Sequence, residues 1–260
     1  MDISVIHGDL PATTCDVLVV NLFAGVTYPG GATGAVDAAL DGWIINLIAQ
    51  EGFSGKLNEI LELPTFGKIP AKRVLVVGLG ARESFGAEEI RQVAATAIKR
   101  ARALKAKTVA TLLHGAGVAG LPAEMCAQAV TEGTLLGAYE FDKYKTPSSE
   151  GKTRVERLLI VERDKEKVAV SHAGIATGRI IAEGVNMTRD LANEPPDLVT
   201  PEFLAFSAQT IAREFGCMCE VWDEGRLAEE RMNCVLMVGR GSTNPPRFIR
   251  MDYAPEGTPS

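Results

Sequence analysis

The sequence predicts an α/β protein, because short apolar runs alternate with longer segments of helical periodicity over the first 163 residues. The clearest strand is Val74–Val77, an unbroken apolar run typical of a strand covered on both faces. The clearest helix follows it, where Ile90–Leu104 repeats apolar residues every three or four positions. Helix-length connections between apolar strands predict a largely parallel sheet with helices on its faces.

The remaining elements of this region follow the same alternation. Further strands are expected at Ile3–Ile6, Val17–Asn21, Thr108–Leu113 and Leu158–Val161. One more helix is expected to bury a single stripe from Val36 to Ile48, which includes Trp43, and another is expected from about Pro122 to Tyr139.

Two changes in composition divide the chain. Proline, serine, glycine and charged residues replace apolar ones at Lys143–Lys152, and a second change falls near Arg163. Lys165–Leu191 then has no proline and keeps a helical period throughout, so we expect a long, mostly buried helix that connects two domains. We therefore predict an N-terminal α/β domain at 1–163, a connecting helix at 164–192 and the beginning of a second domain at 193–260.

The second domain is expected to open with a helix at Thr200-Pro201-Glu202. Thr200 can cap the helix, proline suits the first turn, and Glu202 faces the positive end of the helix dipole. Its predicted apolar stripe is Leu204, Ala208, Ile211, Ala212 and Phe215, and Gly216 can end it. Three segments then predict strands, namely Cys217–Trp222, Val235–Val238 and Phe248–Tyr253.

The charge and the apolar runs exclude two broad classes of protein. The net charge is −6 with a pI near 5.3, whereas proteins that bind the nucleic-acid backbone carry a basic surplus, so no nucleic acid is indicated. No apolar run approaches the roughly 20 residues needed to span a bilayer, and the N-terminus has no signal-like segment. The five scattered cysteines indicate reduced core thiols and a cytoplasmic protein.

Three glycine-rich segments are candidates for phosphate binding. Gly115–Gly120 reads G-x-G-x-x-G, but the acid expected some twenty residues later is missing, since Thr131–Ala138 is still helix and contains only Glu132. Gly78–Gly80 also follows a strand, and Gly30–Ala35 precedes a helix. We interpret all three as tight turns. A nucleotide-binding module is the alternative, although Arg82 is the only basic residue beside these turns, which predicts an affinity for NAD or ADP-ribose no tighter than about 1 mM.

Residue chemistry by itself predicts no active site. The three histidines, His7, His114 and His172, are too far apart in sequence to form a metal motif. Cys217 and Cys219 lie two residues apart but lack further ligands at zinc spacing, and Ser242 lacks the pattern of a nucleophile elbow. We therefore predict no catalytic, cofactor-binding or metal-ligating residue in this chain.

Three segments together resemble the leucyl aminopeptidases of peptidase family M17. Glu132–Lys145 is similar to the family's "aeg-LgaY-Fd-Yk" segment, and Gly184–Pro201 is similar to its "N-tRdL-N-Pp-n--tP" signature. Met232–Tyr253 is similar to "m----aVg-GS--pPr-i-l-Y". The order and spacing of the three segments agree with the family.

The resemblance implies a macro-domain-like N-terminal domain, a long connecting helix and the beginning of an α/β peptidase domain. It also implies removal of N-terminal amino acids from peptides by two divalent metals, Mn or Zn, which polarise the scissile carbonyl and activate a water. Members of the family assemble as hexamers. The family's metal ligands come from "vGKG-tFDSGG" and "NTDAEGR" segments, which are expected after Tyr253 and are not found before Ser260.

The expected function is therefore that of the N-terminal part of a leucyl aminopeptidase, inactive as this 260-residue chain, with no metal cofactor of its own. The alternative is a protein derived from an aminopeptidase with a non-catalytic role in assembly or small-ligand binding. Peptide specificity, metal identity and oligomeric order do not follow from the sequence.

Overall fold

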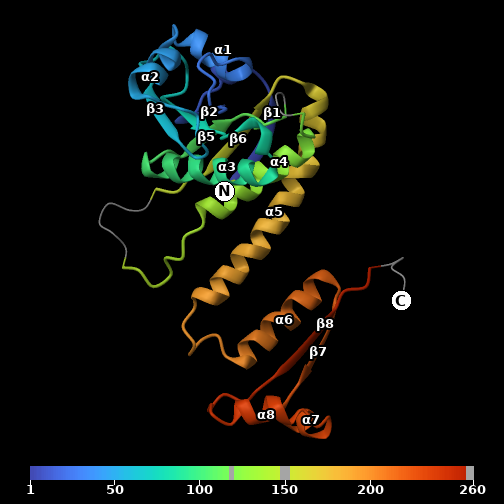
Figure 1. Ribbon diagram of the computed structural model, residues 1–260. Helices are drawn as coiled ribbons and strands as arrows, with labels where there is room; N and C mark the ends of the chain where they lie inside the picture. The colour runs from blue at the N-terminus through green and yellow to red at the C-terminus, as the bar shows by residue number, and fades with distance from the viewer. Residues whose placement is uncertain (117–119, 147–152, 256–260) are drawn as a thin grey trace. The chain divides into compact units, whose positions relative to one another are not determined.

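The computed structural model describes residues 1–116, 120–146 and 153–255 (Figure 1). The chain folds as two compact units, Met1–Thr188 and Arg189–Ser260, each with its own sheet. The predicted three-part division with limits at 163 and 192 stays a prediction. Much of the predicted change of composition at Lys143–Lys152 lies outside the described residues.

The first unit is built on a six-stranded sheet in the order β1-β6-β5-β2-β4-β3. All neighbouring strands pair in parallel except β3, which pairs antiparallel with β4 at one edge. The strands are β1 (Asp2–His7), β2 (Val17–Leu22), β3 (Ile60–Pro64), β4 (Arg73–Gly78), β5 (Thr108–Thr111) and β6 (Arg157–Glu162). The predicted α/β class is confirmed, whereas the sequence analysis missed the edge strand β3.

Helices cover both faces of this sheet. On one face, α1 (Gly31–Ala39) and α2 (Trp43–Glu51) share a buried cluster with Leu18 and Val20 of β2. On the other face, α3 (Ala87–Ala103) and α4 (Ala123–Ala138) share a second cluster with Val17 and Val19. Because successive side chains of a strand point to opposite faces, the almost wholly apolar β2 supplies both cores.

The single helix expected from Val36 to Ile48 is two helices. Asp41 and Gly42 adopt left-handed backbone angles, with φ of 55° and 78°, and interrupt the helix between α1 and α2. The buried carboxylate of Asp37 accepts hydrogen bonds from the amides of Ile44 (2.8 Å) and Ile45 (3.2 Å), which caps α2. Leu40, Ile44 and Ile48 are buried as predicted, but Trp43 is 43% exposed because the break rotates it out of the stripe.

The long helix predicted from Lys165 is confirmed as α5 (Lys165–Asn193). It packs against α4 where a glycine takes the place of a side chain: a Cβ on Gly174 would lie 2.0 Å from the carbonyl oxygen of Glu124. The prediction that this helix is mostly buried is wrong, since Ile180 is 72% exposed and burial is confined to one narrow stripe.

The second unit contains a two-stranded antiparallel sheet and three helices. Its elements are α6 (Pro201–Phe215), β7 (Met218–Trp222), α7 (Glu224–Glu229), α8 (Asn233–Gly239) and β8 (Phe248–Asp252). The predicted ends of α6 are confirmed, because the Thr200 hydroxyl accepts from the amide of Phe203 at 3.2 Å and Gly216 ends the helix with φ of 71°. Its buried face is Ala205, Ala208 and Ala212, whereas Leu204 and Phe215 of the predicted stripe are exposed.

The strand predicted at Val235–Val238 is wrong, since these residues lie in α8. A run of four apolar residues has no period that separates a strand from a helix, so residue type alone favoured a strand. In the structure the amide of Arg240 donates to the carbonyl of Leu236 at 3.2 Å, and no residue of α8 is buried.

Candidate functional site

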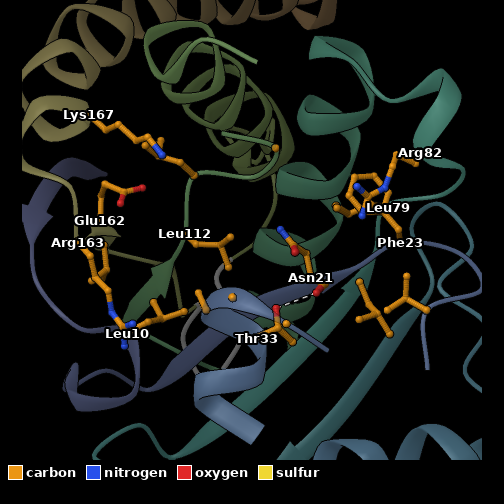
Figure 2. Close-up of a pocket in the computed structure, with 18 of the residues that line it drawn as sticks. Leu10, Asn21, Phe23, Thr33, Leu79, Arg82, Leu112, Glu162, Arg163 and Lys167 are labelled. Carbon is orange, nitrogen blue, oxygen red and sulfur yellow. Dashed lines mark hydrogen bonds between the residues drawn. The ribbon is translucent and has the colours of Figure 1, made fainter. Parts of the chain in front are cut away.

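A cavity of about 620 Å³ opens at the carboxyl ends of the parallel strands in the first unit (Figure 2). Every one of the five parallel strands contributes a residue at or just after its end. These residues are Gly8 after β1, Asn21 and Leu22 of β2, Leu79 after β4, Leu112 and Leu113 after β5, and Val161 and Glu162 of β6. The helix end at Gly30–Thr33 and the apolar side chains of Leu10, Phe23 and Val26 complete much of the wall.

The strand order explains why the cavity lies there. The chain leaves β2 through α1 and α2 toward β3 and β4, whereas it leaves β5 through α4 toward β6, on the other side of the sheet. The two neighbouring strands β2 and β5 therefore direct their following segments apart. Where two neighbouring parallel strands send their connections in opposite directions, an open sheet has a crevice at the strand ends. Ligands of α/β proteins commonly bind in this crevice.

The charged side chains in the lining are mostly basic. Arg82, Arg163 and Lys167 line the cavity together with one acid, Glu162. Figure 2 shows Arg163 and Lys167 on one side of the cavity and Arg82 on the other. The guanidinium of Arg82 lies 4.9 Å from the centre of the Phe23 ring, and Arg163 forms an ion pair with Asp9. Arg163 and Lys167 were not predicted as site residues. They follow β6 and lie more than 80 residues after β4, so the sequence does not place them near Arg82, which follows β4.

A buried polar network holds Asn21 in this lining. The side-chain nitrogen of Asn21 lies 2.7 Å from Nδ1 of His114, and Nε2 of His114 lies 3.2 Å from the hydroxyl of Thr111. Burial lowers the pKa of His114 to about 4, so the imidazole is neutral at neutral pH. A neutral ring with its proton on Nε2 accepts from Asn21 and donates to Thr111. His114 is thus a buried partner of a cavity residue.

All three glycine turns border the cavity, the Gly78–Gly80 turn through Leu79. Gly30 and Gly31 lie at the start of α1 and line it, and Gly115 lines it with φ of 88°. Gly78 is required for close approach, because a Cβ there would lie 1.9 Å from the carbonyl oxygen of Lys56. Residues 117–119 of the G-x-G-x-x-G segment lie outside the described residues.

Glu132, the acid noted after the Gly115–Gly120 segment, has a structural role. It is only 3% exposed and forms an ion pair with Arg91 of α3, while Gln128 donates to its second oxygen at 2.7 Å. Its position joins α3 to α4, so it belongs to the packing of the helical layer.

The candidate metal ligands lie apart or in exposed positions. His7 and His172 are exposed on β1 and α5, and His114 is fully buried. Cys217 and Cys219 border a shallow hollow of about 550 Å³ in the second unit. Within residues 1–116, 120–146 and 153–255, no group of three or more His, Cys, Asp or Glu side chains is arranged to hold a metal. That this chain has no metal site stays a prediction.

The other residues considered from the sequence have local roles. The Ser242 hydroxyl accepts from the amide of Asn244 at 3.0 Å, after the end of α8. Burial raises the pKa of Cys15 to about 12 and that of Cys126 to about 11, as expected for core thiols. Cys217 and Cys219 are half-buried and Cys234 is exposed, so the prediction that the cysteines are core thiols is confirmed only for Cys15 and Cys126. No helix in the described part of the chain combines the length and the apolar character of a membrane span.

Curated relatives match most of this chain. It is 37% identical over 221 residues to a probable cytosol aminopeptidase of Persephonella marina, which covers 85% of the chain and 44% of the relative. It is 33% identical over 254 residues to a probable cytosol aminopeptidase of Alkaliphilus metalliredigens, which covers 97% of the chain and 51% of the relative. The chain thus spans about half the length of the curated relatives it matches.

Solved structures share the fold. A mutant of tomato leucine aminopeptidase superposes with a TM-score of 0.83 over 99% of this chain and 52% of that one, at 24% identity. The bottromycin maturation enzyme BotP in complex with Mn superposes with a TM-score of 0.71 over 93% of this chain and 46% of that one, at 28% identity.

Two family models match in the order in which they occur along the chain. The N-terminal domain of the cytosol aminopeptidase family matches residues 19–148, and the catalytic domain of the same family matches residues 186–260. The first match covers most of β2, the strands β3, β4 and β5 and the helices α1 to α4, and the second begins within α5. With the resemblance of the three sequence segments, these matches show that the chain belongs to the cytosol aminopeptidase family, peptidase family M17.

Proposed function

We propose that this chain is the N-terminal part of a two-metal leucyl aminopeptidase and that the 260 residues alone do not hydrolyse peptides. The observation that supports this most directly is the pair of family matches, N-terminal domain first and catalytic domain second. In the longer protein, two divalent ions, Mn or Zn, would supply the Lewis acidity for peptide hydrolysis. Family resemblance assigns their ligands to segments that follow Tyr253.

The residues present do not fit the metal pair. Fitting it requires several carboxylate or imidazole ligands around each ion, and the described part of the chain holds no such group. No catalytic step is therefore assigned to a residue of this chain. The proposal places the longer protein in the cytoplasm, as a homo-oligomer that acts on peptides.

The surface of the second unit supports a role within a larger domain. Large apolar side chains are more than half exposed there, among them Phe206, Phe215, Met218 and Val238. A concentration of exposed apolar side chains in a small unit is typical of a surface that another part of a protein covers. The proposal assigns that covering to the remainder of the catalytic domain.

The direct test is an assay of the purified 260-residue chain with leucine amide, with and without Mn²⁺ or Zn²⁺. We expect no release of leucine above a blank preparation. A chimaera in which residues 1–260 continue into the C-terminal half of the Alkaliphilus metalliredigens relative should gain metal-dependent activity, with that half alone as the control. Metal-dependent turnover by the 260 residues would refute the proposal. Intact mass of the protein from its native host would show how long the natural chain is.

The second candidate function is small-ligand binding by the first unit. The cavity at the strand ends favours it, since its volume is typical of ligand sites.

A further inference from the structure

The cavity of the first unit has a charge opposite to that of the chain. The chain has a net charge of −6, yet three of the four charged side chains in the lining, Arg82, Arg163 and Lys167, are basic. Glu162 is the only acid of the lining in the described residues, and Asp9 offsets part of the charge of Arg163. A basic recess in an acidic protein attracts anions.

Backbone amides add to this basic recess. The amide of Gly34 donates to the carbonyl of Gly30 at 3.0 Å, which is the first bond of the α1 helix. The amides of Gly31, Ala32 and Thr33 precede it and have no partner within the helix. Gly30, at the cap position, has no side chain to bond them, and all four residues line the cavity. Such amides, together with the helix dipole, favour a phosphate group.

The helix end is fixed relative to the sheet. The Thr33 hydroxyl donates to the backbone oxygen of Asn21 at 2.8 Å, shown as the dashed line in Figure 2. The side chain of Asn21 is in turn bonded to the buried His114. Because these groups are already placed, a ligand would meet a preformed surface and lose little affinity to reordering.

The size and the apolar walls of the cavity exclude a simple inorganic ion as the best-fitting ligand. A volume of about 620 Å³ lies in the range of about 300 to 1,000 Å³ that small-molecule sites occupy. Phe23, Val26 and Leu79 line it with apolar surface, and the guanidinium of Arg82 lies over the Phe23 ring. A ligand that fills the space therefore needs an organic part as well as an anionic part.

We propose that this cavity binds a nucleoside diphosphate or a phosphorylated compound of similar size. The phosphates of this ligand lie at the amides of Gly31–Thr33, between the basic side chains. The organic part of the ligand lies against Phe23 and Leu79. The inference deepens the small-ligand candidate named above and holds whether or not the longer protein is a peptidase. It implies a tighter affinity than the limit of about 1 mM expected from the sequence, because Arg163 and Lys167 add positive charge to the cavity lining.

The test is calorimetric titration of the whole 260-residue chain with ADP, adenosine and inorganic phosphate. We expect saturable binding of ADP with a Kd below about 100 μM, and at least tenfold weaker binding of adenosine and of phosphate alone. Equal affinity for adenosine would overturn the phosphate site, and equal affinity for inorganic phosphate would overturn the nucleotide size. No binding at 1 mM ADP would overturn the proposal as a whole.

A matched pair of variants on α5 separates the site from general charge effects. Lys167→Gln removes a cavity lysine, and Lys165→Gln removes the same charge from an exposed position on the same helix, outside the lining. We expect Lys167→Gln to weaken ADP binding at least fivefold and Lys165→Gln to change it less than twofold. Amide shifts that saturate with ADP should include Gly31, Ala32 and Thr33. Equal losses in both variants, or shifts confined to other segments, would overturn the assignment. None of these measurements depends on peptidase activity, so their failure would leave the aminopeptidase proposal intact.

Discussion

At the scale of single residues, Asp16 joins three strands of the first sheet. It precedes β2, and its carboxylate accepts from Lys72 Nζ at 2.6 Å and from the amides of Lys107 and Thr108, both at 2.9 Å. The hydrogen bond from Lys72, with those from the two amides, holds the pKa of Asp16 well below its ordinary value of 3.8. The ionised carboxylate therefore stabilises the ends of β2, β4 and β5 at neutral pH.

The lowered pKa sets the sign of a pH effect. A carboxyl group with a lower pKa in the folded chain stabilises it above the unfolded pKa, and loses this effect as the pH falls below that value. Asp16→Asn should lower the free energy of unfolding by about 2 kcal/mol at pH 7, since it removes charge-assisted hydrogen bonds. The difference from the wild type, followed by urea unfolding, should be constant from pH 8 to 5 and shrink below about pH 4.

Asp41→Asn is the matched control for Asp16→Asn. Asp41 pairs with Lys68 at the surface, with its side chain 74% exposed, so its loss should leave the urea midpoint almost unchanged. A constant deficit of Asp16→Asn from pH 8 down to pH 3 would contradict the assigned role of the carboxylate.

At the scale of elements, glycines on α5 differ in what surrounds them. A Cβ on Gly174 would lie 2.0 Å from the backbone oxygen of Glu124, whereas a Cβ on Gly184 would meet nothing within 4 Å. Backbone of α4 cannot move aside as a flexible side chain can, so Gly174 determines how closely these two helices approach.

Two alanine substitutions on the same helix should therefore have opposite effects. Gly174→Ala should destabilise the first unit by about 1 to 3 kcal/mol through overpacking. Gly184→Ala should raise stability by about 0.5 to 1 kcal/mol, because alanine has the higher helix propensity. Urea midpoints measured for both variants check this, and equal stability of the two would show that the α4–α5 contact adjusts without cost.

The α1–α2 break shows how an element depends on one side chain. The apolar spacing of Val36, Leu40, Ile44 and Ile48 is continuous, so it predicted one helix. The structure keeps these four side chains buried, yet it places left-handed residues at 41 and 42 and caps α2 with Asp37. Apolar periodicity indicates which side of a helix faces the core. It does not detect a capping carboxylate that bonds to amides seven and eight residues later.

At the scale of the whole molecule, the two units differ in how much apolar surface they bury. Both large clusters of buried apolar residues in the described chain lie in the first unit. The fully or nearly buried apolar residues of the second unit are Ala205, Ala208, Ala212 and Leu227, three of which are alanines. Burial of apolar surface is the main stabilising contribution, so the second unit should be the less stable one.

The two tryptophans allow this to be measured, because Trp43 lies in the first unit and Trp222 in the second. Trp222→Phe leaves fluorescence that reports on the first unit, and Trp43→Phe leaves fluorescence that reports on the second. We expect the Trp222 signal to change at a lower urea concentration than the Trp43 signal. Coincident transitions for the two variants would mean that the chain unfolds as one cooperative unit.

The sequence by itself determined the class of the fold, most of its elements and the family. Parallel strands are continuous apolar runs, helix faces repeat every three to four residues, and the caps at Thr200 and Gly216 act on their immediate neighbours, so each can be read locally. The four apolar residues Val235–Val238 show no period that separates a strand from a helix, and the strand predicted there is wrong.

Only the tertiary structure decided the cavity. Asn21, Arg82, and the pair Arg163 and Lys167 come from three separate segments, and none stands in a motif that marks it. They meet because the five parallel strands end at one edge of the sheet, which is a consequence of strand order and of helical crossovers. The identity of a side chain is local, but its neighbours across a sheet are fixed by the path of the whole chain, and the charge of the cavity depends on those neighbours.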